Sequence, residues 1–493
     1  MSGVAEKSGT EMPRARFFPN PLDMLQLLLN QWASHSVTCI GVADMSLSLK
    51  SRLACTGLGG LIALAAFTAP ANAKPSDINS RFKSNLSEMV DENLDDWVDV
   101  YKDFHANPEL GLHETRSAGI IAERLKELGF EVTEGIGQTG VVGILKNGKG
   151  PLVMVRADMD GLPVQEKTGL DYASTVQTEW NGEPKYVMHA CGHDAHMAIF
   201  LATAQTLVEM KKDWKGTLMF VAQPAEEGGG GASKMMADGI FDRFGVPDYG
   251  FALHVTPAAY DSVQIVKGQM NSFAGGFDIV FNGVGGHGSR PSTTIDPVMM
   301  ASKFVVDLQS VVSREKPEQE FGVISVGAIQ GGSAGNIIPD SVRVRGTVRW
   351  YKPEVGEKLL AGVRRTADAI VAMTGAPEAD ISIRSGGTAV YNDPNLSEDT
   401  LAAMSRVFPE GKVTFAAPTT GSEDYGEFLK SFSNSVYFRV GVYDPALFDE
   451  NGKTIDFMRT PGNHSPFFAP VPAPTIDTGV TAMTTAVMNV MAK

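Results

Sequence analysis

Short apolar runs alternate with amphipathic segments along the first half of the chain. Residues 77–102 and 115–128 carry apolar side chains at helical spacing, and Gly129 ends the second segment. A further helix is expected over residues 195–211. Four runs have the length and composition of buried strands, at residues 141–145, 152–155, 217–222 and 249–255. Strands that alternate with helices predict an α/β domain with a helix-flanked sheet.

The pattern changes between residues 272 and 385. The expected elements there are strand 277–282, helix 297–313, strand 322–330, strand 341–350, helix 353–373 and strand 380–384. This β-α-β-β-α-β order is that of a ferredoxin-like unit, which forms a complete small domain. The first pattern then returns, with helices at 395–407 and 422–431, a strand at 435–442, a proline-rich loop at 466–474 and a helix from about residue 474. We therefore predict a larger domain made of residues 74–271 and 386–493, with residues 272–385 inserted in it as the ferredoxin-like domain.

Residues 45–73 have the pattern of a secretory signal. A lysine and an arginine precede an uncharged apolar run, and a small-residue Ala-Asn-Ala site ends at Ala73. The alternative is a membrane anchor, but the apolar run is shorter than the roughly 20 residues that span a bilayer. We expect an exported protein, periplasmic or secreted, without a stable membrane anchor. Residues 1–44 are interpreted as a leader wrongly assigned ahead of Met45.

Composition and charge narrow the class of protein. The 493 residues are 43% hydrophobic and 20% charged, which is ordinary for a soluble enzyme with well-buried cores. A formal net charge of −15 argues against nucleic acid and anionic membrane surfaces as partners, because both attract basic patches. Of the three cysteines only Cys191 lies beyond the signal, so the processed chain cannot form an intramolecular disulfide.

Side chains that can bind metal gather after the predicted strands, whose carboxyl ends meet in an open α/β sheet. Cys191 and His193 flank Gly192 and can face one site, where sulfur, nitrogen and oxygen donors suit Zn²⁺ or a comparable divalent ion. Taken alone, this spacing is more typical of a buried thiol and a core histidine than of a metal site. The other candidates are Asp158, Asp160, Glu226, Glu227, His254, which is expected to end its strand, and His464, in the loop before the last helix.

The adjacent pair Glu226-Glu227 follows a predicted buried strand directly. Paired acids are usually solvated, but this position and the glycine-rich residues 228–231 make a solvated surface the poorer interpretation. One glutamate can bind a metal while its neighbour acts as general base on a metal-bound water.

Seven short motifs follow one another along the chain: DMDGLP at 158–163, HACGHD at 189–194, QPAEEG at 223–228, GGHG at 285–288, NIIP at 336–339, GSED at 421–424 and NHSP at 463–466. Together they resemble the M20 metallopeptidase family, and within it the amidohydrolase subgroup of hippurate hydrolases, N-acyl-amino-acid deacylases and auxin-conjugate hydrolases. The resemblance runs in order from about His105 to the C-terminus. The resemblance implies a zinc-peptidase-like catalytic domain with a mixed sheet, and a lid and dimerisation domain in the inserted residues 272–385.

The resemblance also implies roles for individual residues. Glu226 falls at the catalytic glutamate, and His287 at a lid histidine that reaches the partner subunit's active site to steady the oxyanion. Asn336 matches a lid asparagine that helps to hold substrate. The ligands of a two-metal site are implied to be Cys191, His193, Glu227, His254 and His464.

Other polar residues are assigned supporting roles. Members of the wider family have a metal-binding histidine at the position of Asp158, and the Cys-Gly-His stretch is expected to compensate for its absence. The residues expected to orient the ligands are Asp158, Asp160, Asp194 and Glu423. Arg290 and Arg349 are candidates for binding a substrate carboxylate, with a solvated arginine as the alternative. Framework histidines are expected at His105, His113, His189 and His196.

The predicted activity is metal-dependent hydrolysis of the amide bond of N-acyl amino acids. Two divalent ions per subunit would activate a water, with Glu226 as general base. The thiolate favours Zn²⁺, carboxylate and water favour Mn²⁺, and Co²⁺ and Ni²⁺ stay open. Partners are a small N-acyl amino acid or dipeptide and a second copy of the chain, bound through the lid domain. The alternatives are a dipeptidase or carboxypeptidase of the same family and, more remotely, a non-catalytic binding protein on a hydrolase scaffold.

Overall fold

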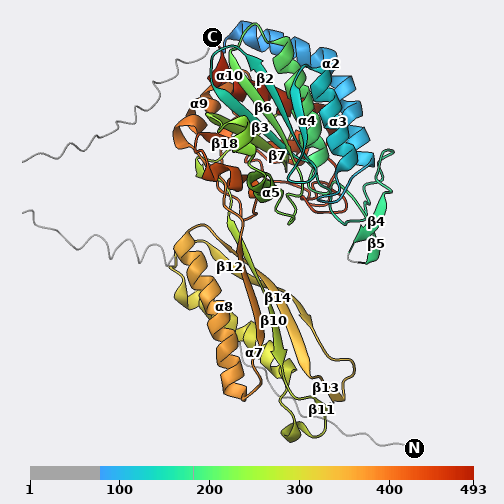
Figure 1. Ribbon diagram of the computed structural model, residues 1–493, viewed down its shortest axis with the longest axis vertical. Coiled ribbons are helices and arrows are strands. Elements are labelled where there is room, and N and C mark those ends of the chain that lie inside the picture. Colours follow the sequence, from blue (N-terminus) through green and yellow to red (C-terminus); the bar gives the residue numbers. More distant parts are fainter. Residues whose placement is uncertain (1–77, 181, 493) are drawn as a thin grey trace, which may run out of the picture. The chain divides into compact units, whose positions relative to one another are not determined.

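The computed structural model describes residues 78–180 and 182–492 (Figure 1). The predicted leader at 1–44 and the predicted signal at 45–73 lie outside the described residues. Among the helices that are described, none combines the length and the apolar composition needed to cross a membrane.

An eight-stranded sheet forms the larger part of the described chain, in the order β1-β2-β6-β3-β7-β18-β8-β17. β3 pairs in parallel with β6 and β7, and β18 in parallel with β7, whereas β1–β2, β2–β6 and β18–β8 are antiparallel. The sheet is therefore mixed, as predicted. Its strands are β1 (Glu131–Ile136), β2 (Gly140–Asn147), β3 (Leu152–Asp158), β6 (Gly216–Gln223), β7 (Tyr249–Ala259), β8 (Val263–Ile265), β17 (Val413–Phe415) and β18 (Ser435–Tyr443).

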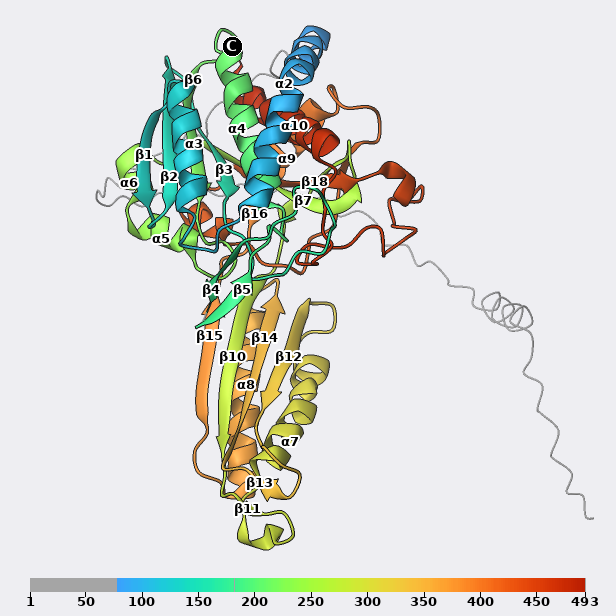
Figure 2. The same cartoon turned by 90° about the vertical axis from the view of Figure 1, so that its right-hand side faces the viewer.

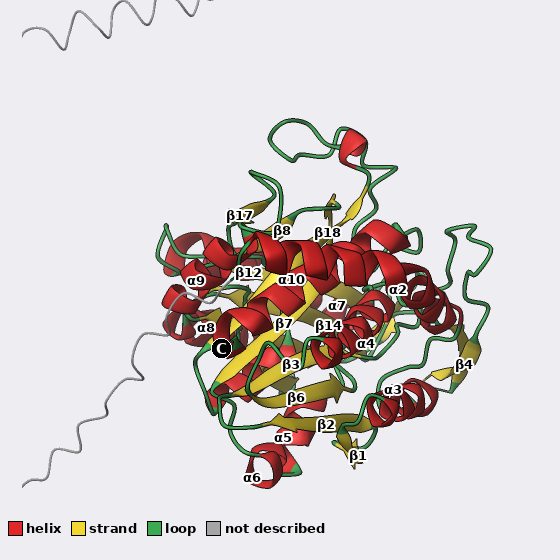
Figure 3. Ribbon diagram, turned by 90° about the horizontal axis from the view of Figure 1, so that it is seen from above, coloured by secondary structure: helices red, strands yellow, loops and turns green. Residues whose placement is uncertain are grey.

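Two cores lie on opposite faces of this sheet, because successive side chains of a strand point to opposite sides. In β6, Leu218 and Phe220 belong to one core, and Met219 and Val221 to the other. Helices cover both faces (Figure 3). The first core is closed by α2 (Ser80–Ala106), α3 (Thr115–Glu127), α4 (His193–Glu209), α9 (Pro394–Met404) and α10 (Pro472–Met491), and the second by α5 (Gly231–Ala237), α6 (Ile240–Phe244) and the 3₁₀ helix η3 (Asp424–Lys430).

Helix α4 begins at a glycine that no other residue replaces easily. Gly192 caps the helix with φ +93°, and a Cβ there would lie 2.3 Å from Val255 Cγ2. Left-handed backbone of this kind favours glycine. The close approach brings Cys191 and His193, on either side of it, against the middle of the sheet.

A four-stranded antiparallel sheet forms the inserted segment, in the order β12-β14-β10-β15 (Figure 2). Its elements follow one another as β10 (Phe273–Asn282), α7 (Pro297–Ser310), β12 (Gly322–Gln330), β14 (Ser341–Trp350), α8 (Pro353–Thr374) and β15 (Asp380–Gly386). The predicted β-α-β-β-α-β order is therefore confirmed. Both helices pack on one core that is separate from those of the large sheet. β10 and β15 pair Ala274 with Gly386, so the segment starts and ends side by side.

Some predicted elements differ from the structure. The helix expected at 422–431 is the 3₁₀ helix η3, and the helix expected from residue 474 begins at Pro472, inside the predicted loop. A proline fits the first turn of a helix because its missing N–H would have no partner there. The short strands β1, β8 and β17 and the hairpin of β4 (Gln177–Trp180) and β5 (Glu183–Tyr186) were not predicted, since too few apolar residues mark them.

Candidate active site

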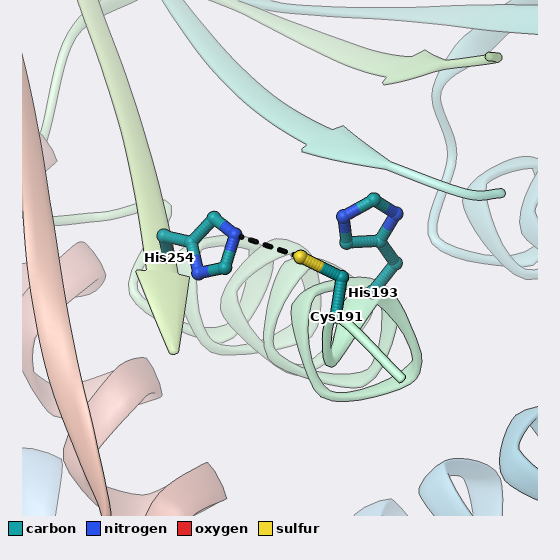
Figure 4. A group of neighbouring side chains, drawn as sticks. All are labelled: Cys191, His193 and His254. Carbon is teal, nitrogen blue, oxygen red and sulfur yellow. Dashed lines mark hydrogen bonds between the residues drawn. The ribbon is translucent and has the colours of Figure 1, made fainter. Parts of the chain in front are cut away.

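Three of the predicted ligands meet where α4 begins (Figure 4). Cys191 Sγ lies 3.3 Å from His254 Nε2, and donor atoms of Cys191, His193 and His254 all lie within 4.8 Å of one another. His254 lies inside β7 rather than at its end as predicted, because β7 continues to Ala259. The pairing of β7 with β3 stops earlier, at Ala252, which leaves His254 facing the site.

Backbone carbonyls fix the protonation of both histidines. His193 Nδ1 lies 2.8 Å from the carbonyl oxygen of Asp160, and His254 Nδ1 lies 2.6 Å from that of Val255. A carbonyl oxygen can only accept, so each Nδ1 carries a proton and Nε2 is the nitrogen left to bind a metal. Within the part of the chain that the structure describes, His193 Nε2 is buried and has no hydrogen-bond partner. Both rings are therefore prepared to bind a metal through Nε2.

The carboxylate of Asp160 orients the glutamate pair. It accepts the backbone N–H groups of Glu226 at 3.0 Å and of Glu227 at 2.9 Å. The preceding Ala225 has φ +47°, an unusual backbone for a residue with a side chain, and its N–H donates to Glu114 Oε1 at 2.7 Å. These contacts hold the turn after β6 so that Glu226 and Glu227 share a cluster with His193.

The loop before α10 brings in the fifth predicted ligand. His464 Nε2 lies 2.9 Å from Glu227 Oε1, and His464 forms a group with Cys191 and Glu227 whose donor atoms lie within 4.8 Å of one another. His464 has φ +69°, and its N–H donates to the carbonyl of Ala190 at 2.7 Å. The side chain of Asn463 donates to the carbonyl oxygens of Cys191 and Val255. The loop is thus tied directly to the residues beside two other ligands.

The donor set fits divalent metal ions. All five predicted ligands belong to overlapping groups of close donor atoms. Burial and the carboxylates of Glu227 and Glu226 raise the pKa of the Cys191 thiol well above its ordinary value, so a nearby cation is needed to hold a thiolate here. Thiolate, imidazole and carboxylate together are donors that Zn²⁺ and similar ions accept.

Asp158 forms a further close group with His193 and His196, but its oxygens have other partners. Asp158 Oδ2 accepts from Arg156 at 2.6 Å, and Oδ1 lies 2.6 Å from His196 Nδ1. His196 Nε2 accepts the N–H of Val255 at 2.9 Å, so both nitrogens of His196 are used. Asp158 and His196 therefore support the site rather than offer free donor atoms.

The buried guanidinium of Arg156, a residue not predicted from the sequence, joins several of these groups. Its Nη1 donates to Asp158 at 2.6 Å, its Nη2 to Glu423 Oε1 at 2.8 Å and its Nε to Gln223 Oε1 at 2.8 Å. Glu423 also accepts from the Tyr437 hydroxyl at 2.6 Å. A charged residue inside an apolar strand was the available signal, because a buried arginine requires acidic partners.

Glu226 lies beside this network, and the neighbouring carboxylates change its pKa. Acidic oxygens of Glu226, Glu423 and Asp424 lie within 4.8 Å of one another. Burial and the carboxylates of Glu423 and Asp424 raise the pKa of Glu226 well above its ordinary value. Burial and Glu423 likewise raise the pKa of Asp424 to about 8. Such a carboxyl can hold and release a proton near neutral pH, which suits a general base that later acts as an acid.

A cavity of about 680 Å³ opens above these groups. Its lining includes the metal-binding candidates Cys191, Glu227, His254 and His464, together with Glu226 and Glu423. Arg349, predicted as a substrate-binding candidate, lines it as well. So does Arg439, which the sequence analysis did not single out.

The other lid candidates do not line this cavity. His287 lies on β11 (Gly286–His287), which pairs with β13 (Ile337–Ile338), and the carbonyl of Asn336 accepts the N–H of Gly288 at 2.8 Å. His287, Arg290 and Asn336 are exposed together at this end of the inserted segment. Within one chain they are therefore separate from the metal-binding candidates.

Asp194 and the framework histidine His189 differ from expectation, whereas His105 is a hydrogen-bonded framework residue as predicted. The carboxylate of Asp194 lies 2.6 Å from His105 Nδ1 and accepts the N–H of Ala195, so it contacts none of the predicted ligands. His105 Nε2 lies 3.0 Å from Glu166, which makes it part of a buried ion cluster. His189 was expected to be hydrogen-bonded, but among the described residues neither of its buried ring nitrogens has a partner.

A mixed α/β sheet that gathers sulfur, nitrogen and carboxylate donors next to a further carboxylate is the arrangement of a metal-dependent hydrolase. The chain belongs to peptidase family M20/M25/M40, whose profile matches residues 154–451. It is 37% identical to the hippurate hydrolase of Campylobacter jejuni, over 69% of this chain and 88% of the relative. It is 34% identical to thermostable carboxypeptidase 2 of Saccharolobus solfataricus, over 74% of this chain and 90% of the relative.

Among solved structures, a dinuclear metal-binding peptidase of the M20 family from Bacillus subtilis is similar. The TM-score is 0.63 at 27% sequence identity, and the match covers 81% of this chain and 99% of that one. The family and the amidohydrolase subgroup that the seven motifs predicted are confirmed, and the protein is an enzyme of the metal-dependent amidohydrolase and peptidase class.

Proposed function

We propose that this enzyme hydrolyses the amide bond of N-acyl amino acids. Two divalent ions per subunit, held by Cys191, His193, Glu227, His254 and His464, would supply Lewis acidity and lower the pKa of a bound water. The relationship to a hippurate hydrolase supports this substrate class, because hippurate is an N-acyl amino acid. Zn²⁺ and Mn²⁺ are both compatible with the donors, with Co²⁺ and Ni²⁺ as further options.

One observation carries the proposal most directly: among the described residues the carboxylate of Glu226 has no hydrogen-bond or ion-pair partner, yet it lies in the cluster of donors. Its backbone is fixed by Asp160, and burial and neighbouring acids favour its protonated form. Glu226 would take a proton from the attacking water and return it to the leaving amine.

Glu226→Gln tests this role. The variant should keep its metal content and lose about 100- to 10 000-fold in turnover of N-acyl amino acids, the usual contribution of a general base. Exposed Glu410 offers the matched control, since Glu410→Gln changes the same functional group at a residue that does not line the cavity. Near-normal turnover by Glu226→Gln, with metal bound, would reject the assignment.

We further propose that the enzyme works as a dimer in which His287 serves the partner subunit's active site. The exposure of His287, Arg290 and Asn336 at the end of the inserted segment supports this idea, because these residues are free to meet a second copy. The oxyanion of the tetrahedral intermediate is the group that His287 would steady. Mixing His287→Ala with Glu226→Gln should restore part of the activity, since one of the two sites in a heterodimer would then have both groups intact. Mixed dimers as inactive as the two parents would contradict this arrangement.

A peptidase that cleaves dipeptides or C-terminal residues is the second candidate, favoured by the relationship to a carboxypeptidase. Assays of N-acyl amino acids and dipeptides on metal-reconstituted protein would separate the two. A protein that binds these compounds without hydrolysing any of them would instead be the binding protein on a hydrolase scaffold.

We also propose that the enzyme is exported, on the strength of the signal pattern at residues 45–73. N-terminal sequencing of protein recovered from the periplasm or medium should give a chain that starts near Lys74. A mature chain that starts upstream of Met45 would contradict the proposal.

A further inference from the structure

Arg439 lies on the face of the sheet that carries the active site. In the parallel pairing of β18 with β7 it stands beside His254, and it is two residues beyond Tyr437, which also lines the cavity. Paired residues of adjacent strands point to the same side. The guanidinium of Arg439 therefore enters the cavity next to a predicted metal ligand.

This guanidinium is only partly satisfied. Nη2 donates to the carbonyl of Ala417 at 3.1 Å, whereas Nε is buried and has no hydrogen-bond partner among the described residues. Nor does any carboxylate in the described part of the chain form an ion pair with Arg439. Burial lowers the pKa of Arg439, which shows that the environment works against its charge.

Arg349 repeats the pattern in the same cavity. It lies on β14, and its Nη1 reaches the carbonyl of Val348 at 3.4 Å, but among the described residues it has no carboxylate partner. Burial lowers its pKa as well. Two arginines of one cavity thus lack counter-ions.

Arg156 shows that the chain can neutralise a buried arginine on this same sheet. Its guanidinium contacts the carboxylates of Asp158 and Glu423. Arg439 and Arg349 are half-buried, and a partly desolvated cation without such partners is unfavourable unless a ligand supplies the anion. The missing partners of Arg439 and Arg349 therefore indicate that the cavity receives an anionic ligand.

We propose that Arg439 is a specificity-determining residue that binds a second carboxylate of the substrate, so that the enzyme prefers N-acyl derivatives of acidic amino acids. This inference rests on the proposed function. The α-carboxylate that every N-acyl amino acid carries can pair with one guanidinium, Arg349. A side-chain carboxylate of aspartate or glutamate type is needed to pair with the other, Arg439. A neutral substrate would leave Arg439 desolvated and unpaired, which is how a polar site rejects an analogue that lacks the matching group.

The test compares N-acetylglutamate with N-acetylglutamine, which have nearly the same shape and differ in the charge of the side chain. Metal-reconstituted wild-type enzyme should prefer N-acetylglutamate by about 10- to 100-fold in kcat/KM, the usual value of a hydrogen bond to a charged group. Arg439→Gln should abolish the preference mainly through KM, and Arg439→Lys should retain part of it. The exposed Arg406 provides the control, because Arg406→Gln removes an arginine outside the cavity and should keep the wild-type preference.

A second measurement removes turnover from the test. In the metal-loaded Glu226→Gln background, calorimetric titration with N-acetylglutamate should show binding that is weaker by a similar factor when Arg439→Gln is added. Equal hydrolysis of the two substrates by wild-type enzyme, or an equal loss on both in Arg439→Gln, would overturn the inference and leave amide hydrolysis intact. Hydrolysis of neither these substrates nor other N-acyl amino acids would instead reject the proposed function.

Discussion

Replacing Arg156 by methionine should lower the unfolding free energy of the domain built on the eight-stranded sheet, and the burial of this residue sets the expected size of the loss. The guanidinium is fully buried, 2.6 Å from Asp158 Oδ2 and 2.8 Å from Glu423 Oε1. An exposed ion pair contributes at most about 1 kcal/mol. Removing one partner of a buried pair costs about 3–5 kcal/mol, because the remaining charge stays desolvated without a counter-ion. The burial of Arg156 places Arg156→Met in the second range.

Urea denaturation at fixed pH and saturating metal measures this loss. Trp97 and Trp214 are buried in the core of the large sheet, so their fluorescence follows its unfolding. Glu423→Gln in the Arg156→Met background should cost less than the sum of the two single changes, since it removes a charge that the first change left unpaired. Arg406→Met at the surface should stay within about 0.5 kcal/mol of wild type. A loss below about 1 kcal/mol for Arg156→Met, or strict additivity in the double variant, would refute the reasoning.

Three further predictions concern the metal site and the cluster behind it. Gly192→Ala should lower the unfolding free energy by about 1–3 kcal/mol, because residue 192 has φ +93° and the new Cβ would lie 2.3 Å from Val255 Cγ2. It should also lower metal affinity, measured by competition with a chelator, and unchanged affinity would contradict this prediction. Burial lowers the pKa of His105, but hydrogen bonds to Asp194 and Glu166 raise it to about 10. Protonated His105 therefore stabilises the fold fully below about pH 6.5, and this stabilisation is lost as the pH rises toward 10. The difference in unfolding free energy between wild type and His105→Gln should therefore shrink over that interval, and a constant difference would exclude the ion pair. Cys191 should react slowly with thiol reagents in metal-loaded protein and faster after chelation at alkaline pH, where its raised pKa no longer keeps the metal-free thiol protonated, and equal rates there would show that the thiol is not a ligand.

The strands and helices that the sequence predicted are those whose pattern is local. The apolar runs at 152–155 and 217–222 became β3 and β6, because strands buried on both faces must be apolar throughout. Element order in the inserted segment also follows from a local pattern, there strands such as β14 in which buried and exposed residues alternate. Short edge strands such as β17 depend instead on pairing partners far away in the chain, which no local pattern shows.

The candidate site divides in the same way. The sequence motifs predicted Cys191, Glu227 and His464 as ligands of one site, and in the structure these residues form one group of donors. Arg439 gave no such signal, because its importance comes from strand register, which sets it beside His254. The partners of Asp194 could not be predicted from the sequence either, since His105 reaches Asp194 only through the packing of α2 against α4.

The pairing of Ala274 with Gly386 places both ends of the inserted segment at neighbouring positions. A segment that departs and returns at neighbouring positions can be lengthened, shortened or exchanged without changing the order of the strands that it interrupts. The eight-stranded sheet draws its strands only from outside this segment. Evolution could therefore alter the inserted unit, and with it the surfaces that we propose meet substrate or a second copy, while the chemistry of the large sheet stayed fixed.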